Sequence, residues 1–124
     1  MAITAAAWTE YPAISVRVLQ VRPVFDAVAA ERLARRIVYL AAGGERAIVV
    51  DLSGIEAVGA EAVAPLVAAA RRVEADGVRI SVVFDTLLQT FAMPGIEAFY
   101  DVAVTAQDAV ARLARRGAGV RGAA

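Results

Sequence analysis

Two short runs rich in β-branched residues, at residues 47–52 and 79–84, place the tightest limits on the fold. Each run is mostly apolar, which is typical of a strand buried on both faces of a sheet. Between them, residues 60–75 carry apolar side chains at helical spacing, which predicts a helix closed by the Asp76–Gly77 turn. A buried strand, a helix and a second buried strand in this order indicate an α/β sheet covered by helices.

A second helix is predicted at residues 27–42. Asp26 stands where an N-cap residue belongs, and Gly43 and Gly44 follow the last residue of the apolar period. The predicted inner face consists of Ala30, Leu33, Ile37 and Leu40, and the predicted solvent face of Glu31, Arg32, Arg35 and Arg36.

The rest of the chain supplies weaker elements. Apolar and polar side chains alternate at residues 14–21, as in a strand with one solvent-exposed face. Residues 85–92 suit a short helix, residues 100–104 a strand, and residues 105–116 a last helix. We therefore expect a mixed sheet of four to five strands flanked by about four helices. The expected organisation is an N-terminal segment at 1–13 that adds a possible edge strand, one domain at 14–116, and a flexible tail at 117–124.

Two local features leave alternatives open. Trp8 and Tyr11 either act as exposed anchors for a partner or clamp the N-terminal segment onto the domain. Pro65 lies beyond the first turn of a predicted helix, so we expect that helix to start late or to kink.

Composition removes several classes of function. Thirteen basic and thirteen acidic residues balance, which argues against a protein that mainly binds nucleic acid or an anionic membrane surface. The chain has no cysteine and no histidine, which excludes disulfides, a thiolate nucleophile, the usual zinc sites and a Ser–His pair. Charges interrupt every apolar stretch, and the first residues do not resemble a secretory signal, so we expect a cytoplasmic protein without direct membrane insertion.

Candidate catalytic groups are few. Ser15, Ser53 and Ser81 have neither lysine nor histidine to activate them. The carboxylates of Asp51, Glu56 and Glu61 follow a buried strand, where ligands of α/β sheets often bind, but no glycine-rich phosphate loop accompanies them. We expect structural roles for these carboxylates, no cofactor and no enzymatic activity; a small enzyme or nucleotide-binding domain is the least favoured hypothesis.

The stretch 47–63, AIVVDLSGIEAVGAEAV, resembles the centre of a STAS domain, the fold of bacterial anti-sigma-factor antagonists. Other pieces of the family pattern follow in the same order. The family's first strand and turn resemble residues 19–26, and its helix-to-strand turn resembles residues 76–80. Its late Gly-Leu-x-x-Leu-Phe signature is similar to residues 94–99, and its closing helix to residues 107–110. The resemblance spans residues 14–114. It implies a non-enzymatic module that binds a protein partner, either an anti-sigma factor kinase or another STAS or signalling protein.

The resemblance places the partner surface at the start of the central helix. The residues it singles out are Asp26, Ser53, Gly59, Ala60, Glu61, Ala62 and Val63. Where the family carries Asp-Ser-Ser-Gly, this chain has Gly-Ala-Glu-Ala, so the phosphorylated serine falls on Ala60 and the next serine on Glu61. No hydroxyl is present at the family's phosphorylation position.

Two interpretations of Glu61 remain. Either it is only a helix-start residue on a constitutive binding surface, or its charge imitates the phosphorylated state and the usual partner is not bound. A STAS subunit of a lipid or solute transporter, with an ATPase or permease as partner, is the alternative function. Self-association as a homodimer is compatible with both.

Overall fold

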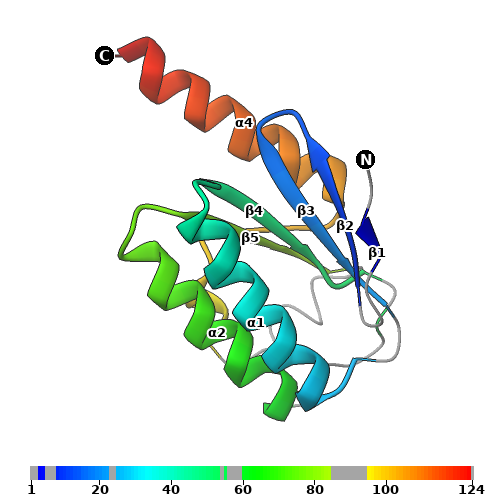
Figure 1. Cartoon of the computed structure of the whole chain (residues 1–124). Helices are drawn as coiled ribbons and strands as arrows, with labels where there is room; N and C mark the ends of the chain where they lie inside the picture. The colour runs from blue at the N-terminus through cyan, green and yellow to red at the C-terminus, as the bar shows by residue number, and fades with distance from the viewer. Residues whose placement is uncertain are drawn as a thin grey trace.

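The computed structural model describes residues 3–4, 8–22, 25–53, 55, 60–84 and 95–123 (Figure 1). Six strands form one sheet in sequence order: β1 (Ile3–Thr4), β2 (Trp8–Ala13), β3 (Val16–Val21), β4 (Ala47–Asp51), β5 (Arg79–Val83) and β6 (Asp101–Ala103). The first three strands pair antiparallel, and β3 to β6 pair parallel. The predicted α/β fold with a mixed sheet is confirmed, with β1 as a short additional edge strand.

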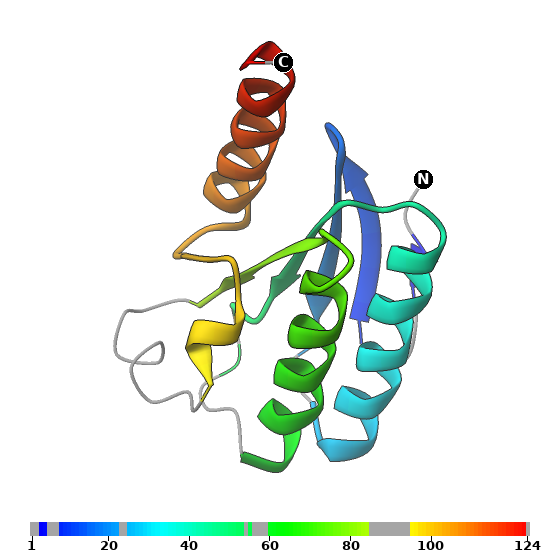
Figure 2. The ribbon, with the colours of Figure 1, turned by 90° about the vertical axis from the view of Figure 1, so that its left-hand side faces the viewer.

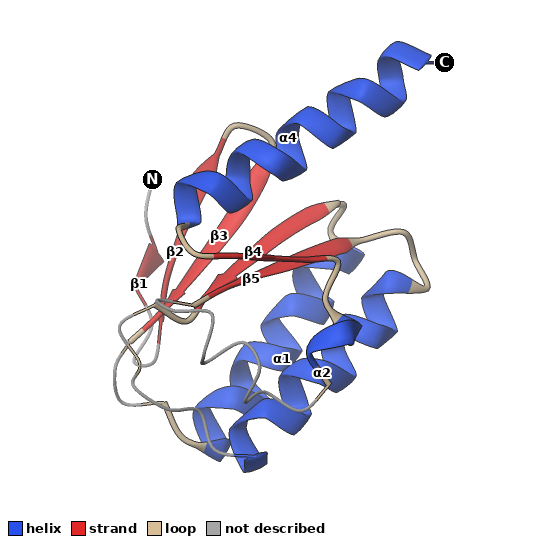
Figure 3. Ribbon diagram, turned by 180° about the vertical axis from the view of Figure 1, so that it is seen from behind, coloured by secondary structure: helices blue, strands red, loops and turns tan. Residues whose placement is uncertain are grey.

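Helices cover both faces of this sheet. Helices α1 (Ala27–Ala42) and α2 (Ala60–Glu74) lie side by side on one face, and α4 (Ala106–Ala123) lies on the other (Figures 1 and 3). A short 3-10 helix, Ile96–Ala98, precedes β6. The part of the chain that the structure describes therefore holds three α-helices, and the helix predicted at residues 85–92 lies outside it.

The strand pattern explains the two-sided core. Alternate residues of β4 face opposite layers: Ile48 and Val50 belong to the cluster under α1 and α2, whereas Val49 belongs to the cluster under α4. All three side chains are fully buried. A central parallel strand that is covered on both faces is expected to be mainly apolar, as the sequence run at 47–52 indicates.

Helix α1 forms where the sequence predicts it. A carboxylate oxygen of Asp26 accepts a hydrogen bond from the backbone N–H of Ala29 at 2.9 Å, and the helix ends at Gly43. The inner face contains Leu33 and Ile37, which are fully buried as expected. The cap, the helical spacing of the apolar residues and the C-terminal glycine all agree, so local sequence alone is enough to locate this helix.

The N-terminal region differs from the expectation. Ile14 and Ser15 form the turn of a hairpin between β2 and β3, so the strand predicted at 14–21 begins at Val16 instead. Ile14 has a φ of 51° and is 76% exposed, a conformation that two-residue hairpin turns require and that a β-branched residue adopts only under strain. Residues 8–13, expected at the edge, form the inner strand β2 between β1 and β3.

The start of α2 and the end of α4 bear on two expectations from the sequence. Helix α2 begins at Ala60 and continues past Pro65 to Glu74, so the late start considered for it does not occur. Helix α4 continues to Ala123, so its predicted end at Arg116 is wrong, and its last turns extend beyond the sheet (Figure 2). Arg112 ties this helix to β6, donating to the carboxylate of Asp101 at 3.2 Å and to the carbonyl of Val102 at 3.1 Å.

Within the described residues, none of the helices combines the length and the apolar character that crossing a membrane requires.

Candidate functional site

The carboxyl edge of the parallel strands is where the sequence places the partner surface. Strands β3, β4 and β5 run parallel, and α1 and α2 follow β3 and β4, so both helices begin at this edge (Figure 2). Asp26, Ser53 and Glu61 belong to three different segments that meet this edge. In open α/β sheets, ligands usually bind at this edge.

Asp26 has two roles at this edge. Its side chain caps α1 through the bond to the Ala29 N–H, and it remains exposed to solvent. The cap fixes the carboxylate, so a partner would meet it in a defined position.

Ser53 is held by the buried carboxylate of Asp51. One oxygen of Asp51, Oδ1, accepts a hydrogen bond from the Ser53 hydroxyl at 2.6 Å and from the Ser53 backbone N–H at 2.9 Å. Asp51 is only 3% exposed, whereas Ser53 is half-buried. The buried acceptor therefore orders the turn after β4 and leaves part of Ser53 accessible.

Tyr11 on β2 lies on the face of the sheet that α4 covers, where it interacts electrostatically with Asp51. Burial raises the pKa of the Tyr11 phenol, and the negative charge of Asp51 raises it further. Tyr11 packs against the apolar cluster beneath α4, so it contributes to holding β2 in the sheet. For Tyr11 the structure supports the clamping role considered from the sequence.

The first turn of α2 separates the predicted partner residues into two groups. Ala60 is the first residue of the helix, and Glu61 is exposed in its first turn. Ala62 and Val63 are each 2% exposed and face the interior, because a helix presents only part of each turn to solvent. At this turn the side chain of Glu61 is therefore accessible from outside, and those of Ala62 and Val63 are not. Gly59 lies outside the described residues.

The acidic group considered as a catalytic centre is not assembled by the described residues. Asp51 is engaged by Ser53, Glu61 is exposed on α2, and Glu56 lies outside the described part of the chain. Across the ranges that the structure describes, there is no group of three or more acidic side chains that could hold a metal ion.

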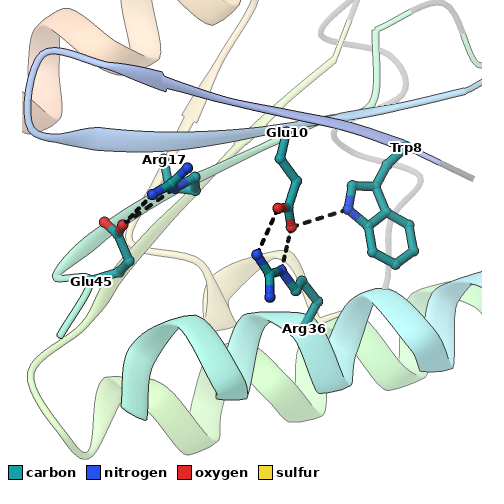
Figure 4. Close-up of polar contacts among 5 residues, drawn as sticks. All are labelled: Trp8, Glu10, Arg17, Arg36 and Glu45. Carbon is teal, nitrogen blue, oxygen red and sulfur yellow. Dashed lines mark hydrogen bonds and ion pairs between the residues drawn. The ribbon is translucent and has the colours of Figure 1, made fainter. Parts of the chain in front are cut away.

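Sequence reasoning missed a polar contact between β2 and α1 (Figure 4). Glu10 is 2% exposed, and both of its carboxylate oxygens accept hydrogen bonds from the Arg36 guanidinium. Trp8 is buried and donates its indole N–H to the same carboxylate at 3.3 Å. The prediction that Arg36 lies on a solvent face is therefore wrong, and Trp8 clamps the N-terminal segment to the domain.

These contacts set the ionisation of Glu10. Burial raises the pKa of its carboxyl, but hydrogen bonds from Arg36 and Trp8 and the charge of Arg36 outweigh burial, so the pKa lies below its usual value. In return, the contact with Glu10 raises the pKa of Arg36. The period of the strand places Trp8 and Glu10 on one face, but no local pattern points to a partner 26 residues away.

The family model described as Mlab, STAS domain, matches residues 13–104, which is most of the chain. The chain belongs to the STAS domain family. The sheet order, the two helices on one face and the strand-to-helix edge described above are thus the STAS architecture of this chain. A search of curated proteins gives no significant match.

Solved structures agree with this STAS fold. RsbS of Moorella thermoacetica, in a serine-to-glutamate variant, superposes with a TM-score of 0.74 at 13% identity, covering 87% of this chain and 95% of RsbS. An anti-sigma factor antagonist from Mycobacterium paratuberculosis gives a TM-score of 0.68 at 22% identity, covering 89% of this chain and 97% of that chain. At these identities the comparison shows a shared fold.

Proposed function

We propose that this STAS protein is a regulatory docking module with no catalytic step of its own. Its partner would contact the carboxyl edge of the sheet, where α1 and α2 begin. Three accessible groups from separate segments support this location: the capping carboxylate of Asp26, the ordered Ser53 turn, and Glu61 in the first turn of α2. The solved anti-sigma factor antagonist with the same fold supports a signalling partner, either an anti-sigma factor or another STAS protein.

The observation that carries the proposal is the alanine at the first position of α2. In the resemblance described above, Ala60 corresponds to the serine that STAS antagonists present for phosphorylation. A phosphate at a helix N-terminus brings up to about two negative charges and a tetrahedral group of strong acceptors. Alanine has no oxygen to receive it, so docking at this edge is not switched by a phosphoryl group on residue 60.

Glu61 supplies a single negative charge at the neighbouring position. It is exposed and lies near the positive end of the α2 dipole, where a carboxylate is favourable. A planar, singly charged carboxylate displaced by one residue is a poor imitation of phosphoserine, so the proposed surface is permanently competent for binding.

A transporter subunit is the second candidate. The observation behind it is the small side chains at the start of α2, where alanine occupies position 60 and the exposed position 64. Small residues allow a second protein to approach the helix closely, as a permanent subunit contact requires. In this case the partner is an ATPase or a permease.

Affinity capture from the native host, followed by mass spectrometry, tests the proposal. The baits are the wild type, Ala60→Trp, and Ala75→Trp as a matched control at an exposed position just beyond α2. We expect the wild type and Ala75→Trp to capture a signalling partner that Ala60→Trp loses. Capture of a membrane ATPase or permease would support the second candidate. An unchanged partner set with Ala60→Trp would refute the location of the surface.

A further inference from the structure

A groove of about 440 Å³ lies between α1 and α2. Its floor consists of small or apolar side chains, Ala34 and Val38 from α1 and Pro65 and Ala68 from α2. These side chains are half-buried or exposed, whereas Leu33, on the inner face of α1, is fully buried. The groove is therefore open to solvent along the helices and begins beyond their first turns. It is a surface separate from the one in the proposed function, and the inference below does not depend on that function.

The groove is long enough to receive a helix. Its lining residues run from 31 to 38 on α1 and from 65 to 72 on α2, and the two helices run in the same direction (Figure 2). With a helical rise of about 1.5 Å per residue, each wall is about 10 Å long, or about two turns. A floor of alanine and proline leaves room for larger side chains from outside, as in the packing of a helix against two others. The shape therefore suits an amphipathic helix that places its apolar ridge on this floor.

Three charged side chains line the walls of the groove, Glu31 and Arg35 on α1 and Arg72 on α2. All three are exposed, and within the described part of the chain none of them forms an ion pair. Two positive charges and one negative charge give the lining an excess of one positive charge. The two arginines belong to opposite walls, so an occupant of the groove can contact one on each side.

Neighbouring carboxylates do not cancel this excess. Glu31 lies one turn before Arg35 on the same helix, at a spacing that permits an ion pair, but such a pair still leaves Arg72 uncompensated. Glu74 follows Arg72 by two residues and does not line the groove, and side chains two apart on a helix do not face each other. Asp76 lies beyond the last residue of α2. An occupant is therefore favoured if it brings carboxylates to the two arginines.

We propose that the groove between α1 and α2 binds an acidic amphipathic helix of a partner protein. The apolar ridge of this helix lies on the alanine and proline floor, and its carboxylates pair with Arg35 and Arg72 from opposite sides. Arginine suits this role, because its planar guanidinium can bind a carboxylate through two parallel hydrogen bonds. A contact of about two turns is small, so the complex is weak and reversible.

Fluorescence anisotropy of labelled peptides with the full chain tests the proposal. The acidic probe is a synthetic helix of about 15 residues, near the shortest length that is helical in water, with leucines at helical spacing and glutamates beside them. The basic probe carries a lysine in place of each glutamate. We expect the acidic probe to bind with a dissociation constant below about 1 mM, and at least about tenfold more tightly than the basic probe.

Reversal of the groove charges identifies the binding site. Arg35→Glu with Arg72→Glu should invert the preference, so that the basic probe binds at least about tenfold more tightly than the acidic one. Arg32→Glu with Arg46→Glu makes the same change of net charge at exposed positions outside the groove, and should keep the wild-type preference within about threefold. Ala68→Trp fills the groove from an exposed position, and should weaken binding of the acidic probe at least about tenfold.

Inversion of the preference separates a lost contact from a lost fold, because an unfolded variant gains no specific affinity for the basic probe. Failure of the acidic probe to bind the wild type at up to about 1 mM would overturn the proposal. Equal affinities of the wild type for the two probes would overturn it as well, as would equal effects of the groove reversal and the control reversal.

Discussion

Arg36 on α1 holds both oxygens of the buried Glu10 carboxylate on β2, with its Nε 2.5 Å from Oε1 and a terminal nitrogen 2.9 Å from Oε2. The centroid of the Tyr39 ring lies 5.1 Å from the Arg36 guanidinium carbon, a cation–π contact that also holds the arginine. This contact joins the N-terminal hairpin to the helical layer, so β2 is anchored by polar contacts as well as by sheet hydrogen bonds (Figure 4).

Removing Arg36 should be far more costly than removing Arg17. Arg36→Ala leaves the Glu10 carboxylate buried without its counter-charge, which costs about 3 kcal/mol or more of unfolding free energy. Arg17 pairs with Glu45 where both side chains are about a quarter exposed, so Arg17→Ala should cost about 1 kcal/mol or less. Urea denaturation of both variants measures the difference, and equal losses would contradict it.

Glu10 should give stability a specific acid dependence. Its pKa in the folded state is lowered from 4.5, so its contribution is complete above about pH 4.5 and is lost as the pH falls through the folded-state value. The difference in unfolding free energy between the wild type and Glu10→Gln should therefore shrink as the pH falls from about 7 to about 3. Urea titrations at each pH test this, since the other carboxyl groups cancel in the comparison. A constant difference would rule out the lowered pKa.

Gly95 joins the 3-10 helix region to α2 through a close approach. Its φ is 80°, and a Cβ at this position would lie 2.9 Å from a methyl carbon of Val67. Gly95→Ala should cost about 2 kcal/mol or more, because strain and overpacking add. Gly44→Ala is the matched comparison, with a φ of 106° but open space around it, and should cost only the backbone strain of about 1 kcal/mol.

A double-mutant cycle isolates the packing part of this cost. In a Val67→Ala background the methyl groups that oppose the new Cβ are absent, so Gly95→Ala should lose less stability than it does in the wild type. Thermal or urea unfolding of the four proteins provides the measurement. Equal costs in the two backgrounds would show that Val67 is not the obstacle.

Local sequence signals were sufficient for some elements. Helix α1 has a cap at Asp26, a helical period and a terminal glycine, and strands β4 and β5 are short runs rich in β-branched apolar residues, so their positions follow from neighbours in the chain. The two strands of the hairpin, β2 and β3, lack such clear local signals in the sequence. Polar residues and Pro12 obscure β2, and Ile14 has no sequence signature of the turn that it forms.

The edge of the sheet at which the candidate residues lie was predictable, but their local arrangement was not. The order of motifs placed Ser53 and the start of α2 at one edge, as the structure has them. The inward orientation of Ala62 and Val63 and the order imposed on Ser53 by buried Asp51 depend on tertiary packing. The same is true of Arg36, because its partner is remote in sequence and its own neighbours are those of a solvent-exposed helix face.

Glu61 allows the two interpretations of the α2 start to be separated. If the surface is constitutive, Glu61→Ala should leave the affinity for the captured partner within about threefold, because one exposed charge at an interface rim has little effect. If Glu61 imitates phosphoserine, the same substitution should strengthen binding about tenfold or more. Surface plasmon resonance with Glu74→Ala as control decides between them.

The most direct test of docking at the start of α2 is isothermal titration calorimetry of the captured partner against Ala60→Trp and Ala75→Trp. We expect Ala60→Trp to weaken the dissociation constant at least about tenfold, and Ala75→Trp to match the wild type. Equal affinities of the wild type and both tryptophan variants would show that the partner binds elsewhere on the domain.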